Sequence, residues 1–263
     1  MEQAGFSEEP KRQPIRRRFI VVLWISMLLG SSFVIVLLTQ TFLKPPIREN
    51  ISSSDWSGYV VFSDSMNPAP VIRNVSASWI IPTVTVSQRD TYSDVWIGIG
   101  GQFDSSLIQT GTEQDSENGS PVYLAWYELL PDYSVTINQT NVSPGDTITA
   151  SISLLDVGTN EWLIEIADAT NGQSFSQSFF YVSSRLSAEW VVERPTVNDA
   201  LTTLADFGSV AFTNIRVSSD SVSGTAADFP FSQVTMYDRL NNQLVTVSQL
   251  ASGGTTFNVA YLP

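Results

Sequence analysis

The chain has 263 residues, of which 43% are hydrophobic, so it can bury a full core in one domain of roughly 200 residues. It contains no cysteine and no histidine. Their absence excludes disulfides, zinc sites built from Cys or His, cysteine nucleophiles and Ser-His-Asp triads. Any hydrolytic chemistry must therefore come from carboxylates, amides, hydroxyls or a carboxylate-bound metal.

The chain begins with a basic segment followed by an apolar one. Residues 1–18 carry five basic side chains, and residues 19–43 are almost entirely apolar. A run of this length can cross a bilayer, and basic residues favour the cytoplasmic side of a membrane. We therefore expect a single-pass anchor in the cell membrane, with 1–18 as a cytoplasmic tail and the rest of the chain outside. A long cleaved signal peptide, which would give a secreted protein, is the alternative.

Beyond this segment the chain is strongly acidic. From residue 49 onward there are 23 acidic residues against six arginines, and there is no lysine. Such a charge repels nucleic acids and anionic membranes, so we expect no nucleic-acid partner. Its self-repulsion falls as carboxylates are protonated, which suits an acid environment.

After a Pro- and Ser-containing linker at 44–54, the residues 55–263 predict strands and turns without a sustained helical period. More than a dozen short strands predict an all-β domain, an antiparallel two-sheet β-sandwich, which we expect to be a monomer. The predicted strands are 56–62, 76–81, 94–99, 106–110, 122–129, 134–137, 147–154, 161–167, 173–182, 189–192, 209–212, 234–238, 243–247 and 255–261. Five Asn-x-Ser/Thr sequons suit an extracellular surface.

Strand alternation predicts which side chains share a face. In the stretch 188–193, Glu189, Val191 and Glu193 lie on one side and Trp190 on the other. If the neighbouring strands pair with this one, a single face collects Trp96, Gln109, Trp126, Glu128, Glu189 and Glu193. Gly98 and Gly100 on the same face would let a ligand backbone approach closely. Aromatic and carboxylate side chains beside glycines predict a binding groove.

The motifs on these strands resemble, in order and spacing, those of the glutamic peptidases, the eqolisin family. They are Trp-Ser-Gly at 56–58, Trp-Ile-Gly-Ile-Gly-Gly at 96–101, Gln-Thr-Gly at 109–111, Ala-Trp-Tyr-Glu at 125–128 and Ala-Glu-Trp-Val-Val-Glu at 188–193. The resemblance covers about 55–263. It implies a concanavalin A-like (lectin-like) sandwich, with Gln109 and Glu193 as the catalytic pair and with Trp96, Trp126 and Glu128 along the substrate groove. It also implies polypeptide substrates, no cofactor and no metal.

Two positions depart from the family pattern. Gly100 and Leu124 stand where the family usually has aspartate, which removes two carboxylates from the groove. Because Glu193 must be ionised to act and the neighbouring carboxylates add charge as pH rises, we expect a bell-shaped pH profile centred well below neutral pH. The two missing aspartates should make it less acidic than is usual in the family.

The expected chemistry is acid endopeptidase catalysis. Glu193 deprotonates a water molecule that attacks the peptide carbonyl, and Gln109 donates to the oxyanion. A glycosidase is an alternative, since Glu128 and Glu193 could flank a sugar from neighbouring strands, whereas Glu189 and Glu193 lie too far apart on one strand. A non-catalytic carbohydrate-binding or adhesive sandwich is the other alternative, and it leaves Gln109 without a role.

Overall fold

The computed structural model describes residues 48–64 and 66–263. These residues form β-strands and two short 3-10 helices, η1 (Ala226–Asp228) and η2 (Ser252–Gly254). The predicted tail and anchor, 1–18 and 19–43, lie outside the described residues. Within the described ranges, no helix has the length and apolar character needed to cross a membrane.

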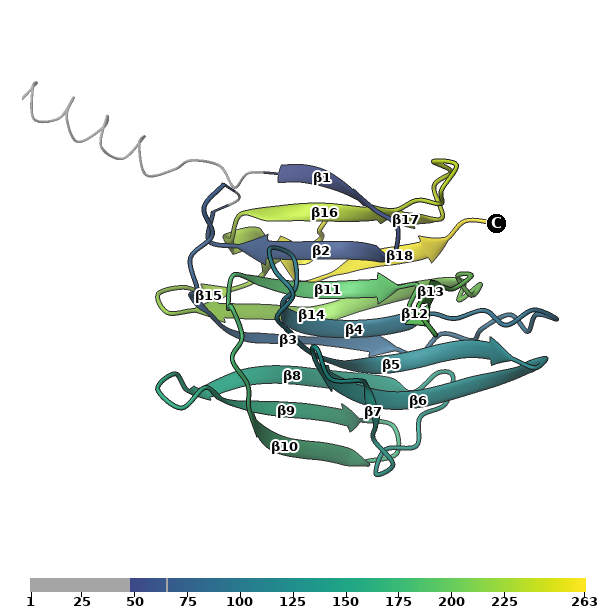
Figure 1. Cartoon of the computed structure of the whole chain (residues 1–263), viewed down its shortest axis with the longest axis horizontal. Coiled ribbons are helices and arrows are strands. Elements are labelled where there is room, and N and C mark those ends of the chain that lie inside the picture. The colour runs from purple at the N-terminus through teal and green to yellow at the C-terminus, as the bar shows by residue number, and fades with distance from the viewer. Residues whose placement is uncertain (1–47, 65) are drawn as a thin grey trace, which may run out of the picture. The chain divides into compact units, whose positions relative to one another are not determined.

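Two large sheets account for the domain (Figure 1). The first has the order β1-β16-β2-β11-β4-β5-β6-β7. Its strands are β1 (Arg48–Ser53), β2 (Trp56–Phe62), β4 (Asp94–Gly100), β5 (Leu107–Glu117), β6 (Ser120–Leu129), β7 (Val135–Thr136), β11 (Ser187–Glu193) and β16 (Phe231–Met236). All pairs in it are antiparallel except β1 with β16. Strand β1 occupies residues 48–53, which the sequence had placed in the linker.

The second sheet has the order β10-β9-β8-β3-β14-β18-β17, with β15 paired to β14. Its strands are β3 (Ile72–Ile80), β8 (Thr147–Asp156), β9 (Glu161–Asp168), β10 (Ser174–Phe180), β14 (Ser209–Ser219), β15 (Ser223–Gly224), β17 (Val245–Val247) and β18 (Phe257–Tyr261). A separate small hairpin joins β12 (Thr196–Val197) to β13 (Ala200–Leu201) directly after β11.

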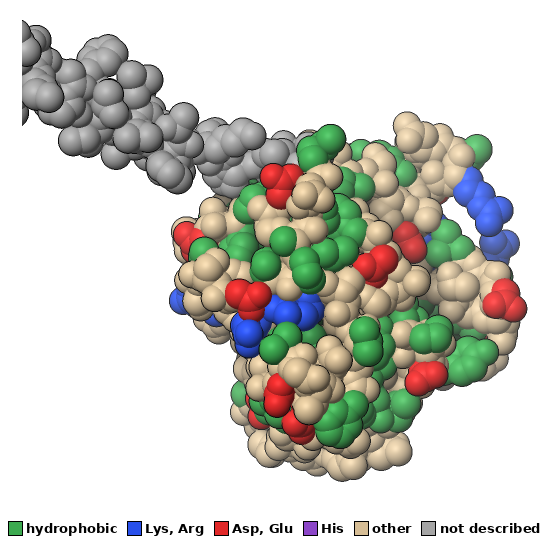
Figure 2. All heavy atoms as spheres, turned by 60° about the vertical axis from the view of Figure 1, so that its left-hand side comes forward, with side chains coloured by type: hydrophobic (Ala, Val, Ile, Leu, Met, Phe, Trp, Pro, Cys, Tyr) green, Lys and Arg blue, Asp and Glu red, His purple; other side chains and the backbone are tan. Residues whose placement is uncertain are grey.

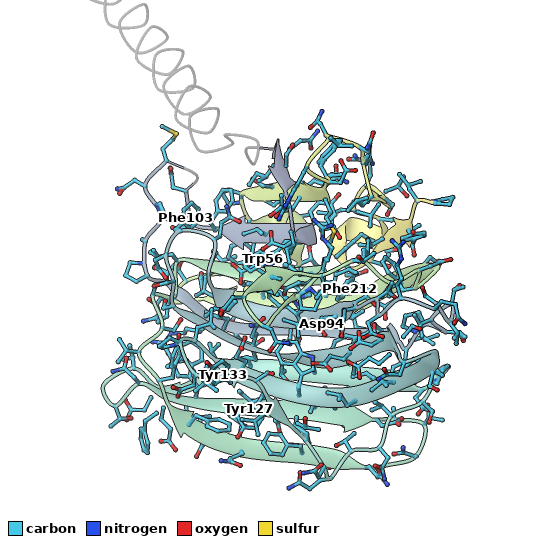
Figure 3. The ribbon with its side chains drawn as sticks, turned by 45° about the vertical axis from the view of Figure 1, so that its right-hand side comes forward. Trp56, Asp94, Phe103, Tyr127, Tyr133 and Phe212 are labelled. Carbon is cyan, nitrogen blue, oxygen red and sulfur yellow. The ribbon has the colours of Figure 1, made fainter. Side chains whose placement is uncertain are left out.

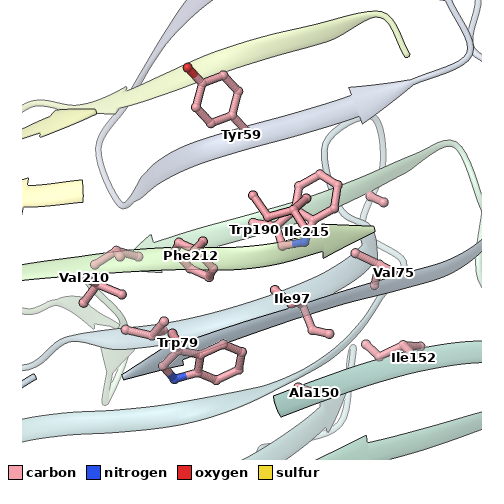
Figure 4. Packing of buried hydrophobic residues seen from close by; sticks show 14 of the residues in the cluster. Tyr59, Val75, Trp79, Ile97, Ala150, Ile152, Trp190, Val210, Phe212 and Ile215 are labelled. Carbon is pink, nitrogen blue, oxygen red and sulfur yellow. The ribbon is translucent and has the colours of Figure 1, made fainter. Parts of the chain in front are cut away.

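The core lies between the two sheets, as strand alternation predicts. Trp190 and Ile97 of the first sheet belong to the same buried cluster as Trp79, Val75 and Phe212 of the second (Figure 4). Burying aromatic side chains of this size is worth several kcal/mol each. The all-β sandwich predicted from the sequence is therefore confirmed for the described residues.

Buried indoles also join the two sheets by hydrogen bonds. Trp190 donates its Nε1–H to the Ser76 carbonyl at 3.0 Å, and Trp79 donates to Thr112 Oγ1 at 3.0 Å. An unpaired buried N–H costs on the order of 1–3 kcal/mol, so these bonds fix the alignment of one sheet on the other. On the outer face seen in Figure 2, hydrophobic side chains form small groups separated by polar surface and backbone.

Candidate active site

The site lies on the face of the first sheet that points away from the core. Strand register places its residues in three cross-strand rows. The first row is Trp56, Glu193, Asp94, Glu113 and Leu124; the second is Gly58, Val191, Trp96, Gly111 and Trp126; the third is Val60, Glu189, Gly98, Gln109 and Glu128. All six polar and aromatic residues that alternation predicted to share a face therefore do so.

Gly111, the last residue of the Gln-Thr-Gly motif, makes room for tryptophan. It lies between Trp96 and Trp126 in the second row. A Cβ added at this position would lie 2.3 Å from the Val95 carbonyl oxygen and 2.5 Å from Trp96 Cβ. A side chain at position 111 would therefore collide with the backbone and Cβ of β4, so the close approach of Trp96 requires glycine here. Trp96 in turn meets Trp56 edge-to-face, with ring centroids 4.9 Å apart.

This face is hollowed into a cavity of about 460 Å³. Its lining combines Trp56, Leu107, Trp126 and Leu130 with Gln109 and seven carboxylate side chains, and it contains no Lys or Arg among the described residues. The carboxylates are Asp55, Asp94, Glu113, Asp115, Glu117, Glu128 and Glu193. Two of these lining residues, Trp56 and Asp94, are labelled in Figure 3. A volume of this size accommodates several residues of an extended peptide or a small sugar.

Glu193 is held by an indole. Trp96 Nε1 donates a hydrogen bond to Glu193 Oε2 at 2.7 Å. Burial raises the pKa of Glu193 to about 8, and the bond from Trp96 opposes this rise because it favours the ionised form. The carboxyls of Asp55 and Glu128 add to the rise by charge repulsion. Glu193 is therefore oriented chiefly by Trp96, with a weaker contribution from the Trp56 indole, and it lies in a site that favours protonation.

Gln109 has a carboxylate partner. Its Nε2 donates to Glu128 Oε2 at 2.5 Å, and the two residues lie directly opposite each other on β5 and β6. Only 4% of Gln109 is exposed, and its Oε1 is buried without a hydrogen-bond partner among the described residues. The amide is thus held through its Nε2 atom, while no hydrogen bond from the described residues holds its Oε1 atom.

The carboxylates of the cavity wall share the same electrostatic environment. Burial raises the pKa of Asp94 well above its usual range, that of Glu113 to about 7 and that of Asp115 to about 8, and in each case neighbouring carboxyls raise it further. Burial also raises the pKa of Glu128. With no cation in the lining, these groups hold protons at pH values where exposed carboxylates are ionised.

Four of the predicted site residues, Glu189, Gly98, Gly100 and Trp96, lie outside this cavity lining. Glu189 is fully buried, and neither of its carboxylate oxygens has a hydrogen-bond partner in the described structure. Gly98 is needed for internal packing, since a Cβ there would lie 2.8 Å from Trp96 Cζ3. At Gly100 a Cβ would lie 2.1 Å from the Ser106 carbonyl oxygen. Both glycines accommodate the protein's own chain, where the sequence had suggested a ligand. Trp96 lies beneath the cavity and reaches it through Glu193.

The sequence analysis did not select Asp94, Glu113, Asp115 and Glu117, which form the acidic wall of the cavity. Strand alternation nevertheless predicts that they share a face with Gln109. Asp94 lies two residues before Trp96, and Glu113, Asp115 and Glu117 follow Gln109 at even spacing. They share its face as a result. Trp56 belonged to a quoted motif but was not assigned to the site, and the structure places it opposite Glu193. No group of three or more acidic side chains in the described residues is arranged to hold a metal ion.

The fold and this cavity define a β-sandwich whose open face combines one amide with a row of carboxylates. The Peptidase A4 family model matches residues 54–261, and the chain belongs to this family. The resemblance to the glutamic peptidases, or eqolisins, is thereby confirmed.

Individual relatives agree with the family assignment. The chain is 30% identical over 191 residues to Aspergillopepsin-2 of Aspergillus niger, covering 64% of this chain and 65% of that protein. It thus spans just under two thirds of that relative's length. It is 28% identical over 233 residues to Scytalidopepsin B of Scytalidium lignicola, covering 84% and 83% of the two chains. The crystal structure of scytalido-glutamic peptidase with a transition state analog inhibitor superposes with a TM-score of 0.66 at 26% identity, covering 80% of this chain and 99% of that one.

Proposed function

We propose that this protein is a glutamic endopeptidase that hydrolyses peptide bonds of polypeptide substrates. Membership of the Peptidase A4 family supports peptide-bond hydrolysis. Gln109 and Glu193 are far apart in sequence but line the same cavity, and Trp96 orients Glu193. This observation supports their assignment as the catalytic pair.

In the proposed reaction Glu193 is the general base and then the general acid. The ionised carboxylate takes a proton from water as the water oxygen attacks the peptide carbonyl carbon. The same proton passes to the leaving nitrogen as the carbon–nitrogen bond breaks. The Trp96 bond keeps Oε2 in place throughout.

Gln109 stabilises the oxyanion that forms on the carbonyl oxygen. Its Nε2 carries two hydrogens, and the bond to Glu128 uses one of them. The second is available to the oxyanion. Removing a donor of this kind typically costs about 10²–10³ in kcat.

The raised pKa values refine the expected pH profile. With its pKa near 8, Glu193 is ionised in only about one molecule in a thousand at pH 5. Above pH 8 the whole wall is anionic and opposes oxyanion formation. We therefore expect a bell whose optimum lies between the ordinary glutamate pKa of 4.5 and about 8, which is less acidic than an unperturbed glutamate would produce.

Two substitutions test this assignment. Gln109→Ala and Glu193→Ala should each abolish digestion of a denatured protein substrate while leaving the circular dichroism spectrum of the 49–263 domain unchanged. Retained proteolysis in either folded variant would refute the role of that residue.

We also propose that the domain lies outside the cell membrane on an N-terminal anchor at 19–43. The support is the five basic residues that precede this apolar run. Protease added to intact cells should release the domain, and protection of the domain until the cells are lysed would contradict this topology.

A further inference from the structure

The contact between Gln109 and Glu128 leaves one polar atom unaccounted for. Gln109 Nε2 donates to Glu128 Oε2 at 2.5 Å, while Gln109 Oε1 is buried and accepts no hydrogen bond from the described residues. A buried amide oxygen without a donor costs on the order of 1–3 kcal/mol. The site therefore lacks one donor beside this oxygen.

A proton on Glu128 would supply that donor. A carboxylic acid and a primary amide match in shape, and they can form two antiparallel hydrogen bonds with each other. We propose that Glu128 is the positioning residue for Gln109, an inference that rests on the proposed function. Glu128 acts as a protonated acid. Its O–H donates a hydrogen bond to Gln109 Oε1, and its carbonyl oxygen accepts one from Gln109 Nε2.

The surroundings of Glu128 favour its neutral form. The titratable groups that face it include Glu193 on β11, Asp94 on β4 and Tyr181, which follows β10. Glu113, Asp115 and Glu117 of β5 line the same cavity, and no Lys or Arg of the described residues does so. Ionisation of Glu128 thus places a negative charge in a cavity whose lining offers no cation to balance it. Burial is the largest influence on the pKa of Glu128 and raises it, whereas hydrogen bonds from Gln109 Nε2 and the Ser134 backbone N–H lower it. The net shift is upward, toward the neutral form.

The pairing has a direct consequence for catalysis. With two bonds to Glu128 the amide cannot rotate, and the free Nε2 hydrogen is aimed at one point in the cavity. When Glu128 ionises, the bond to Oε1 is lost and a charge appears beside the developing oxyanion. The alkaline limb of the pH profile would then report Glu128.

The decisive variant is Glu128→Gln. A glutamine at this position can make both bonds, since its NH₂ donates to Gln109 Oε1 and its carbonyl accepts from Nε2, and it does not titrate. We expect Glu128→Gln to exceed Glu128→Leu in kcat on the acid side of the optimum by about tenfold or more, and its alkaline limb to lie at least about one pH unit above that of the wild type. Glu128→Leu, which can make neither bond, should lower kcat by about tenfold or more with little change in KM.

Glu113→Gln is the matched control for charge. It removes one carboxyl from the same wall but has no contact with Gln109, so it measures the effect of charge alone. An alkaline limb that moves no further in Glu128→Gln than in Glu113→Gln would overturn the proposal. So would a Glu128→Gln variant as impaired in acid as Glu128→Leu.

A second measurement does not depend on activity. In the full-length chain labelled with ¹³C at glutamate carboxyls, the Glu128 signal, assigned by its loss in Glu128→Gln, should remain that of a protonated acid above pH 4.5. Ionisation below that pH would overturn the proposal even in a chain without peptidase activity. A wild type that is inactive but holds Glu128 protonated would instead contradict the proposed function alone.

Discussion

Glu189 and Glu193 lie four residues apart on the same face of β11, yet they occupy different environments. Glu193 lies beside Trp56 at the edge of the cavity and accepts a hydrogen bond from Trp96. Glu189 lies between Val60 and Gly98, is fully buried, and has no hydrogen-bond partner for either oxygen. A position on the open face of a sheet therefore does not decide exposure, because the packing above that face does.

The covering at the Glu189 end comes from the chain that follows β4. Phe103 packs edge-to-face on Phe62, with ring centroids 5.7 Å apart, and Gly101 approaches Trp56. Burial raises the pKa of Glu189 well above the usual range, with the nearby Ser187 hydroxyl lowering it and the Asp104 carboxyl raising it. The cavity that holds Glu193 stays open, so one strand carries both a buried acid and a site for chemistry.

The largest expected difference between the two glutamates is in activity. Glu193→Gln should lower kcat/KM by at least about 10³-fold, because an amide cannot accept the proton from water. Glu189→Gln should leave kcat/KM within about threefold, since that side chain does not line the cavity. Steady-state kinetics on both folded variants checks this, and equal losses would show that Glu189 takes part in the reaction.

Stability should fall as pH rises. The folded-state pKa values of Glu113, Asp115 and Glu193 lie near 7 or 8, above their unfolded values, so the folded state binds more protons in this range. The stabilisation is fully present below about pH 4 and is lost as pH rises through 7 to 8. We expect the free energy of unfolding to drop by at least about 2 kcal/mol between pH 5 and 8, measured by urea titration.

Glu189→Met tests the contribution of the buried glutamate to stability, again by urea titration at several pH values. It replaces the carboxyl with an apolar group of similar volume and removes two unpartnered oxygens. Its stability should decline less with pH than that of the wild type. A variant that is less stable than the wild type at pH 8 would show that the Glu189 carboxyl has a stabilising partner.

A smaller effect is expected from the indole that holds Glu193. Trp96→Phe removes the Nε1–H donor, so the pKa of Glu193 should rise further and the acidic limb of kcat/KM should move to higher pH. We expect a loss of about tenfold on the acid side and less near pH 8. A uniform loss at all pH values would indicate a packing effect alone.

The smallest effect should come from Gly98, which lies in the Glu189 row against Trp96. In Gly98→Ala the new Cβ would meet the far ends of the Trp96 and Leu107 side chains at 2.8 and 2.9 Å. Because these ends can shift, we expect kcat/KM to fall only about threefold. Gly158→Ala, where a Cβ would lie 3.2 Å from Asp156 Oδ1 at an exposed turn, is the control and should have no effect. Equal activities in the two variants would show that Trp96 tolerates displacement.

The sequence by itself determined most of the strands and which residues of each strand share a face, because alternation of side chains along a strand is a local property of the backbone. That Gln109 and Glu193 face the same side of one sheet also required β4 to pair with both of their strands. The sequence also contained the acidic wall, through the even spacing of Glu113 and Asp115 from Gln109. Only the tertiary structure decided that Glu189 is buried, that Gly98 and Gly100 accommodate the protein's own chain, and that residues 48–53 join the sheet. These outcomes depend on which segments pack over a face and which strands meet across it, and such contacts join residues far apart in the sequence.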